Sequence, residues 1–518
     1  QELDVDLLDK NRTLIHSGKL WRCDTGFTGC NWTEVFMLLT DTHLIVTEPK
    51  EGDAITKYHA STRPIPLDLL TSITFTDAPI PKKYEAAGSG SAYPFTVHAS
   101  GRAGAHTLFA ESSHAREQWQ QKLEEAIHSR TFPERSEVFK LRSFGTDKVY
   151  GGRVTCSVTF MTSDGRKLIA IACDNGVWIG FQDDSTSIRQ VLQLKQITQC
   201  AVLEENGLLL VLSDKSLYAY PIDSLLTSMT SETRPGPPCQ KLSGDKDVCF
   251  FRIGRMNNRS LVIYMKKKRW DSVFRVLEPV TNKLKAPDPQ DTWFRVFKDF
   301  FITGDAHDLD FLKARLVLVG STGFEILDLI DFKSVVIPVC DDPPLPEILK
   351  RCKGSRALAM VRQSEEGFLL CYDDFGIYVN RQGEPVDPVQ LVEWEGKAEY
   401  VAQKGPYILL FNPQFIEVRN VQSGRLVQII AGVGVRCLWD GRGATFSPVQ
   451  KEGTKEEIFR QGPVYGAMDI PDKDSRVTAQ HIFELVPTAQ FGPATIPLVL
   501  SEKSSTAPGE SEGSTLVL

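Results

Sequence analysis

Apolar and polar positions follow one another along most of the chain in short strand-like runs, and one arrangement of them recurs six times. Each copy joins a nearly continuous apolar run, a turn of Asp, Asn, Ser, Gly or Lys, and a second run rich in aromatic or β-branched residues. This pattern predicts a β-hairpin. The six hairpins cover residues 167–184, 207–224, 260–280, 315–331, 367–383 and 407–424. Because a hairpin alone cannot bury its faces, the six must be parts of one larger fold.

The spacing of these hairpins predicts a β-propeller. They begin roughly 40 to 54 residues apart, and a further strand pattern such as "VTCSVTF" or "ALAMVRQ" usually precedes them. Four strands at that period match one propeller blade, whereas a parallel solenoid would have a shorter and more regular period. We expect seven blades over residues 136–500. The seventh would pair "CLWDGRG" or "QHIFELVPT" from the carboxyl end with residues 148–153.

Ahead of the propeller, residues 10–130 show several strand patterns and then one helix. The helix is expected over 112–130, capped by Ser112 or Ser113. Its apolar face is the set Ala115, Trp119, Leu123 and Ile127. The fold class is therefore mainly β, with a small barrel closed by a helix and then a propeller. The segment "HSRTFPERSE" (128–137) has the composition of a short linker, and the tail 501–518 has that of a disordered segment.

Composition narrows the classes of partner and compartment. A chain of 518 residues with 42% hydrophobic residues is long enough for two or more domains. The net charge of −7 argues against nucleic acid as a partner, and no apolar run is long enough to span a bilayer. The eleven cysteines show no CxxC pair, so we expect reduced thiols and a cytoplasmic protein. In an exported protein, Cys23 and Cys30 could be bridged.

No catalytic, cofactor-binding or metal-binding set emerges from the motifs. "AGVGVR" (431–436) is interpreted as a turn, and "GDAHDLDF" (304–311) as a loop between strands rather than a metal site. The sharpest charged feature is a basic run with a tryptophan, which is either a solvated turn or a contact for an acidic GTPase surface or anionic lipid. Its members are Lys266, Lys267, Lys268, Arg269 and Trp270.

The first 135 residues resemble a pleckstrin-homology domain. The order of strands and the Trp in the closing helix carry this resemblance, and "LLDKNRTLIHSGKLWR" (7–22) looks like the junction that follows the Dbl-homology helices of Rho exchange factors. The resemblance implies a junction helix before the domain and a phosphoinositide contact. Lys19 and Arg22 match part of that contact, but Glu34 stands where a second-strand cation is wanted, so we expect weak headgroup binding. The Gly-Ser stretch 88–91 is interpreted as a natural flexible loop or an engineered shortening.

The later part resembles the citron homology domain, a propeller that acts as a docking surface, commonly for small GTPases. "GFLLCYDDFGIYVNRQG" (367–383) and residues 391–432 carry this resemblance most strongly. Two families place such a domain after a pleckstrin domain, namely the fungal Rho exchange factors of cell-wall integrity signalling and the citron-type or myotonic-dystrophy-related kinases. The junction and "VFRVLEPV" (273–280) favour the exchange factors.

These resemblances imply a non-catalytic regulatory and scaffolding region. The expected partner is a Rho-type small GTPase, with the cytoplasmic tails of cell-wall stress sensors as further candidates. No cofactor is expected, and the catalytic Dbl-homology domain is expected to be absent from this chain. Recruitment to the cell cortex or plasma membrane through weak peripheral contact is expected. The alternatives are the tail of a citron-type kinase and an enzyme built on the propeller.

Overall fold

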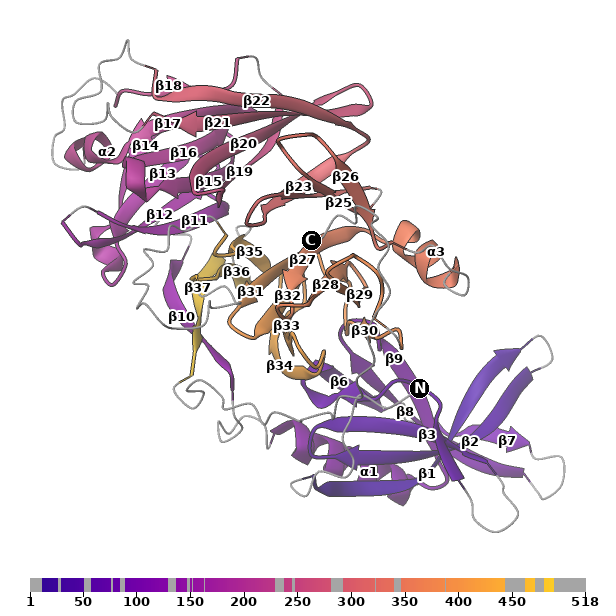
Figure 1. The fold of residues 1–518 in the computed structure, drawn as a ribbon. Coiled ribbons are helices and arrows are strands. Elements are labelled where there is room, and N and C mark those ends of the chain that lie inside the picture. The colour runs from indigo at the N-terminus through magenta and orange to yellow at the C-terminus, as the bar shows by residue number, and fades with distance from the viewer. Residues whose placement is uncertain are drawn as a thin grey trace, which may run out of the picture.

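The computed structural model shows a mainly β protein whose amino-terminal sheet lies beside a ring of seven four-stranded sheets (Figure 1). It describes residues 12–26, 29–50, 57–75, 78–83, 89–128, 137–146, 150, 152–162, 164–228, 237–244, 247–280, 292–321, 323–339, 346–386, 388–442, 462–470 and 479–488. The expected junction helix before residue 12 and the tail 501–518 lie outside the described residues.

The amino-terminal domain is one nine-stranded antiparallel sheet followed by a helix. Along the chain come β1 (Leu14–Gly26), β2 (Gly29–Thr40), β3 (His43–Lys50), β4 (Lys57–Ala60), β5 (Ile65–Pro66), the short 3-10 helix η1 (Leu67–Leu69), β6 (Leu70–Phe75), β7 (Ile80–Lys83), β8 (Ser89–Ala99), β9 (Ala105–Ala110) and α1 (Ser113–His128). The strand order β4-β3-β2-β1-β9-β8-β6 joins its two halves where Trp21 of β1 faces Phe109 of β9.

Helix α1 covers the core of this domain, as its spacing predicts. The Ser112 hydroxyl accepts a hydrogen bond from the amide of Ala115 at 3.1 Å, which caps the first turn. Trp119 and Leu123 are buried among strand residues, and Trp119 packs edge-on against His16 of β1. The succession of strands and one closing helix along the chain is the one expected, while the assignment to the pleckstrin-homology family stays a prediction.

Seven blades form the propeller, and the expected mainly β, seven-bladed fold is confirmed. Blade 1 holds β11 (Val154–Met161), β12 (Lys167–Cys173), β13 (Gly176–Phe181) and β14 (Arg189–Leu192); blade 2 holds β15 (Ile197–Leu203), β16 (Leu208–Ser213), β17 (Ser216–Pro221) and β18 (Gln240–Lys241). Blade 3 holds β19 (Val248–Met256), β20 (Arg259–Lys268), β21 (Asp271–Pro279) and β22 (Phe294–Thr303); blade 4 holds β23 (Ala306–Phe311), β24 (Leu316–Gly320), β25 (Gly323–Leu327) and β26 (Ser334–Ile337).

Blade 5 holds β27 (Ala357–Arg362), β28 (Gly367–Tyr372), β29 (Phe375–Asn380) and β30 (Leu391–Glu393); blade 6 holds β31 (Tyr400–Lys404), β32 (Tyr407–Asn412), β33 (Phe415–Asn420) and β34 (Leu426–Ala431). Blade 7 combines β35 (Arg436–Trp439), β36 (Tyr465–Ile470) and β37 (Ala479–Pro487) with β10 (Phe139–Thr146) from the start of the ring. Short helices η4 (Ser185–Ser187), η5 (Glu204–Asn206), α2 (Ile222–Ser228) and α3 (Pro346–Gly354) lie between strands.

The six hairpins of the sequence are the second and third strands of blades 1 to 6. In blade 5, every residue of β28 is buried, because its two faces pack against blades on either side. This explains the continuous apolar runs, since a strand covered on both faces has no reason to alternate. Burying each such side chain stabilises the ring by roughly 1.5–3 kcal/mol.

Three local expectations need correction. The carboxyl-terminal closing strand is "AQHIFELVP", as expected, but its partner is Phe139–Thr146 rather than residues 148–153, because β37 pairs from Pro487 to His481 with that segment. Ser89–Ser91 belong to β8 and pair with β7, so the described part of the Gly-Ser stretch is strand and not loop. The segment "GDAHDLDF" contains β23, the first strand of blade 4, and not merely a loop.

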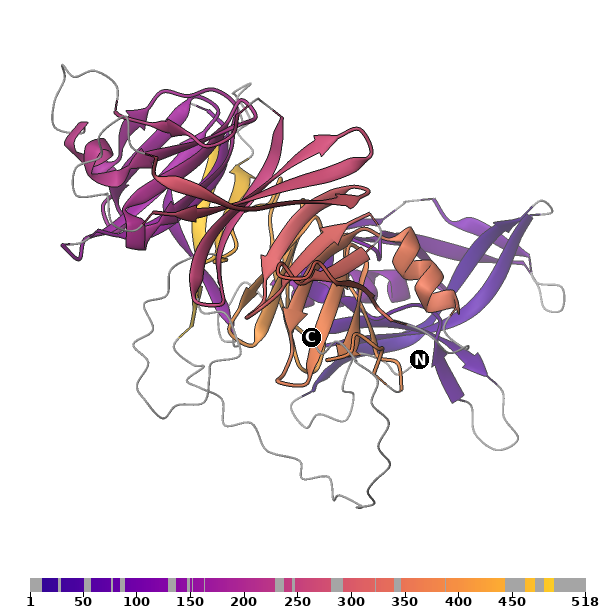
Figure 2. The same ribbon diagram turned by 45° about the horizontal axis from the view of Figure 1, so that its top comes forward.

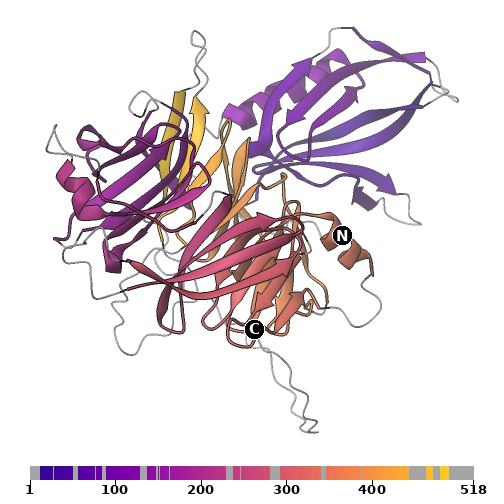
Figure 3. The same cartoon turned by 90° about the horizontal axis from the view of Figure 1, so that it is seen from above.

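Seen from above, the amino-terminal domain sits at one side of the ring, next to the orange segment that holds blades 5 and 6 (Figure 3). Helix η1 contacts β34 there. The propeller is built only of strands and short helices in its described parts, and none of the described helices is both long and apolar enough to cross a bilayer.

Candidate functional site

Blade 3 carries the basic run that the sequence singled out, and its strands extend beyond those of its neighbour. β20 and β22 have ten residues each, whereas β24 of blade 4 has five (Figure 2). The middle of β20 is buried, but its last residues, Lys267 and Lys268, are exposed. The β20–β21 hairpin therefore projects its tip into solvent.

At this tip the five predicted residues lie together on one tight turn. Lys268 faces Asp271 across the hairpin, which leaves Arg269 and Trp270 as the two turn residues. Arg269 has a left-handed backbone with φ of 58°, and the Trp270 side chain is 83% exposed. The fold itself does not require a large apolar side chain at so exposed a position. Exposed tryptophans are common anchors at protein interfaces.

The cations at the tip differ in their surroundings. Lys267 pairs with Asp305 through a 2.7 Å contact between Nζ and Oδ1. The Lys266 ammonium lies 6.0 Å from the centroid of the Tyr264 ring. The Asp305 contact ties the turn to the segment between β22 and β23 and leaves the turn with a net positive charge.

Phe301 is an exposed residue of the same blade that sequence reasoning missed. It lies opposite Val273 on the outer strand β22 and is 67% exposed. The adjacent phenylalanines at 300–301 are the sequence signal for this exposed residue. Phe300 is buried against Phe274, and successive side chains of a strand point to opposite faces, so Phe301 lies on the other face. Trp270 and Phe301 give blade 3 two exposed aromatic side chains.

The candidate phosphoinositide residues on β1 are already paired with carboxylates. Lys19 Nζ lies 2.8 Å from Glu34 Oε2, the acidic residue that stood out in the sequence. Arg22 Nη2 lies 3.0 Å from Glu48 Oε1. A phosphate group would have to compete with these carboxylates, and weak headgroup binding stays a prediction.

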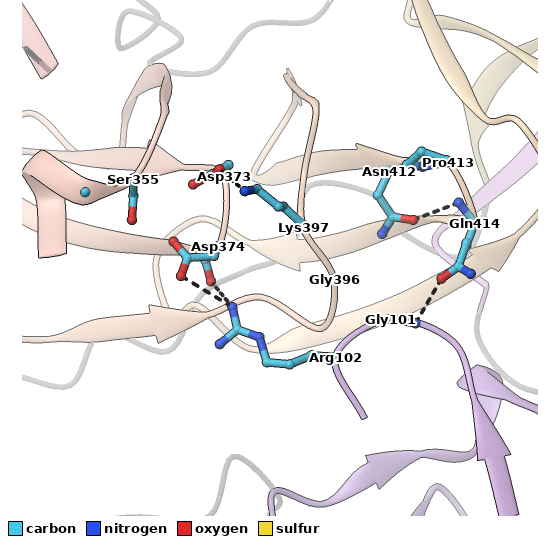
Figure 4. A pocket seen from close by; sticks show the side chains of 11 residues that line it. Gly101, Arg102, Ser355, Asp373, Asp374, Gly396, Lys397, Asn412, Pro413 and Gln414 are labelled. Atoms are coloured by element: carbon cyan, nitrogen blue, oxygen red, sulfur yellow. Dashed lines mark hydrogen bonds and ion pairs between the residues drawn. The ribbon is translucent and has the colours of Figure 1, made fainter. Parts of the chain in front are cut away.

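The amino-terminal domain and the propeller meet at a polar junction, the joint, beside a cavity of about 670 Å³. Gly101 and Arg102, in the turn between β8 and β9, line one side, and Asp374, Lys397 and Gln414 of the propeller line the other. In Figure 4, Arg102 points towards Asp374, and the Gly101 amide donates a 3.0 Å hydrogen bond to Gln414 Oε1. We assign no catalytic role to this cavity, because the charged side chains that line it form ion pairs with one another.

A cluster of buried charged side chains, the central cluster, lies in the middle of the ring. Asp308 of β23 binds Arg252 Nε of β19 at 2.6 Å and Arg442 Nη2 at 2.8 Å. The hydroxyl of Tyr400, on β31, donates to Asp440 at 2.6 Å. The sequence grouped Asp308 with its acidic neighbours but gave no hint of its arginine partners, which come from other blades.

These arginines set the acidity of the cluster. Burial alone raises the pKa of Asp308, but the guanidiniums of Arg252 and Arg442 outweigh it and leave that pKa below its ordinary value. The pKa of Asp440 is lowered in the same way, with burial opposed by Arg442 and Arg252. Because the carboxylates stay ionised beside their arginines, we interpret the cluster as a tie between blades.

The described residues contain no group of three His, Cys, Asp or Glu side chains that could hold a metal ion. Their cysteines differ from the expectation of reduced thiols in one place, since Cys23 of β1 is disulfide-bonded. The free ones are Cys156, Cys173, Cys200, Cys239, Cys249, Cys352, Cys371 and Cys437.

Comparison with known proteins gives a consistent family. Residues 165–441 match the CNH domain family. The chain is 31% identical over 491 residues to the Rho1 guanine nucleotide exchange factor 1 of Schizosaccharomyces pombe, covering 89% of this chain and 35% of that protein. The Rho1 guanine nucleotide exchange factor 2 of the same yeast is 29% identical, with 95% of this chain and 43% of that protein covered.

A budding-yeast protein and a solved structure agree with this. The RHO1 GDP-GTP exchange protein 2 of Saccharomyces cerevisiae is 26% identical over 84% of this chain and 34% of its own length. The AfRom2 CNH domain aligns with a TM-score of 0.53 and 24% identity, covering 67% of this chain and 99% of that one, which supports the fold. The chain thus spans less than half of the length of each of these exchange factors.

Proposed function

The chain belongs to the CNH domain family and is homologous to fungal Rho1 guanine-nucleotide exchange factors, and from this premise we propose that it is the non-catalytic regulatory and scaffolding region of such a factor. In this proposal residues 1–135 form a pleckstrin-homology domain and residues 136–500 form the docking propeller. The catalytic Dbl-homology domain would lie outside this chain.

One observation carries the proposal: the similarity to named Rho1 exchange factors runs through both domains and not through the propeller alone, since it covers 89% of this chain. The same similarity favours the exchange factors over a citron-type kinase as the parent protein. A seven-bladed ring suits a docking role, because it presents loops from many strands on a rigid frame without needing a catalytic group.

We propose that the propeller docks a Rho-type small GTPase through the tip of blade 3. Lys266, Lys267, Lys268 and Arg269 would attract acidic side chains of the GTPase, and Trp270 would be buried at the centre of the contact. The cytoplasmic tails of cell-wall stress sensors are the next candidate partners. The amino-terminal domain would add a weak, salt-sensitive membrane contact that keeps the protein at the cell cortex.

The test is surface-based binding of the whole chain to Rho loaded with GDP or with a GTP analogue, at low and at high salt. Lys266→Glu plus Lys268→Glu should lower the association rate constant about tenfold at low salt and change dissociation less, because rim charges act mainly on encounter. Trp270→Ala should raise Kd about 30-fold, as expected of an interface anchor.

The matched control is Lys140→Glu plus Lys167→Glu, which makes the same change in net charge at exposed positions of blades 7 and 1. It should leave the association rate near that of the unmodified chain. If neither nucleotide form of Rho binds at tens of micromolar while the chain stays folded, the propeller docks a different partner.

A further inference from the structure

Two loops of the amino-terminal domain place arginines on blades 5 and 6. Arg63, just before β5, pairs with Glu395 through a 2.9 Å contact and also donates to the carbonyl oxygen of Glu393 at 2.7 Å. Arg102 pairs with Glu393 at 2.8 Å and donates to the carbonyl oxygen of Asp374 at 2.8 Å. Each arginine thus holds both a side chain and the backbone of the propeller.

The propeller builds this acidic surface, the socket, from its own ion pairs. Arg351 of α3 binds Glu393 at 2.7 Å and reaches Asp374 at 3.4 Å. Deeper in blade 6, Arg419 is fully buried and pairs with Glu417 and, at 3.1 Å, with Glu395. The socket carboxylates are therefore fixed in place by the propeller itself.

The amino-terminal domain adds two cations to the carboxylates of the socket. Within the propeller, Asp374 and Glu393 share Arg351, and Glu395 and Glu417 share Arg419. Arg63 brings a second guanidinium to Glu395, whose side chain is only 7% exposed, and Arg102 brings one to Glu393. Nearby cations stabilise carboxylates that are held away from water, so the propeller gains from keeping these arginines.

The backbone fits as closely as the charges do. The Arg102 amide donates to the carbonyl oxygen of Glu395 at 2.7 Å, so the turn lies directly on the propeller. Gly101 has φ of +74°, and a Cβ there would lie 2.4 Å from that same carbonyl oxygen. Only glycine permits both this conformation and this approach.

We infer that the socket on blades 5 and 6 is a docking site for the chain's own amino-terminal domain, and that this ion-paired joint locks the two domains into one rigid unit. The lock holds whichever partner the propeller docks, so it does not depend on the proposed function. The amino-terminal domain covers the outer part of blades 5 and 6 and leaves blade 3 exposed. The lock also fixes the direction in which the propeller faces relative to any surface that the amino-terminal domain contacts.

The experiment cuts the link between the domains and asks whether they stay together. A specific protease site is introduced into residues 129–136 of the full chain, the protein is cleaved, and the products are separated by size-exclusion chromatography. At about 50 mM salt the two pieces should co-elute, and their association should weaken as salt rises to about 500 mM, because the Arg102–Glu393 pair is partly exposed and is screened by salt. Separation of the cleaved unmodified chain at micromolar concentration and low salt would overturn the inference.

Two variants test the charges and the fit separately. Arg63→Glu plus Arg102→Glu should separate the pieces even at low salt, whereas Lys50→Glu plus Lys122→Glu, with the same change in net charge on the amino-terminal domain, should not. Gly101→Val changes no charge and should weaken association at least tenfold by inserting a side chain against the Glu395 carbonyl oxygen. Co-elution of both the Arg63/Arg102 variant and the Gly101 variant, with circular dichroism unchanged, would show that the joint is not the lock described here.

Discussion

The clearest energetic consequence of the structure concerns Arg419, the fully buried arginine of blade 6. Its guanidinium pairs with Glu417 and Glu395, donates to the Gly424 carbonyl oxygen at 2.8 Å, and lies 5.6 Å from the centroid of the Trp394 ring. Replacing it by methionine keeps most of the apolar volume but removes the positive charge. Glu417 and Glu395 would then both lose the guanidinium of Arg419 while staying buried.

Breaking a buried ion pair from one side typically costs about 3–5 kcal/mol, because the remaining charge stays buried and uncompensated. We therefore expect Arg419→Met to lower the free energy of unfolding of the propeller by about 3–5 kcal/mol. Adding Glu417→Gln removes one stranded charge and should restore at least about 1 kcal/mol, since the two residues are in direct contact. The control Arg425→Met, at an exposed position of the same blade, should stay within about 0.5 kcal/mol of the unmodified chain.

The assay is urea unfolding followed by circular dichroism, with hydrogen exchange of the β32 and β33 amides to identify the transition of blade 6. Exchange is needed because a chain with two domains need not unfold in one step. Unfolding of Arg419→Met at the same urea concentration as Arg425→Met would show that the buried arginine does not stabilise blade 6. Equal stability of Arg419→Met with and without Glu417→Gln would show that the stranded carboxylate is not the cause of the loss.

Three further predictions concern acid, membranes and nucleotide exchange. The lowered pKa values of Asp308 and Asp440 contribute stability above the ordinary aspartate pKa of about 3.9, and this contribution is lost as the pH falls through the lower folded values. The urea midpoint should therefore drop between about pH 5 and pH 3, and a constant midpoint would contradict the role given to the central cluster. In liposome sedimentation, binding should be weak, salt-sensitive and little changed by Lys19→Ala plus Arg22→Ala; tight, headgroup-selective binding abolished by these changes would show that the carboxylate pairs do not weaken the site. In a fluorescent-GDP release assay the chain alone should not accelerate release from Rho, and substantial acceleration would refute its proposed non-catalytic role.

The sequence predicts the propeller well because the pattern of each blade lies within a short stretch of neighbouring residues. In 367–383, an apolar run, a two-residue acidic turn and a second apolar run lie next to each other, and β28 and β29 need no distant partner to be recognised. The closing strand β10 is harder to predict, because its partner β37 lies more than three hundred residues away. No local pattern shows which of the segments near residues 139–153 pairs with it.

The candidate site was only partly predictable for the same reason. The basic turn at 266–270 is visible as a run of adjacent residues, whereas the exposure of Phe301 depends on which face of blade 3 is covered. The joint depends on pairs such as Arg63 with Glu395, which are 332 positions apart and belong to segments with no shared periodicity. From the sequence alone, a single arginine in a loop is expected to be solvated. Its carboxylate partner becomes visible only in the folded structure.

Hydrogen–deuterium exchange of the whole chain, with and without loaded Rho, is the sharpest test of whether the propeller docks a Rho-type GTPase. If it does, exchange should be slower in β20 and β21, around the turn at 266–270, and unchanged in α1 of the amino-terminal domain. Protection confined to residues 12–128, or no protection anywhere in the propeller while the chain remains folded, would contradict it.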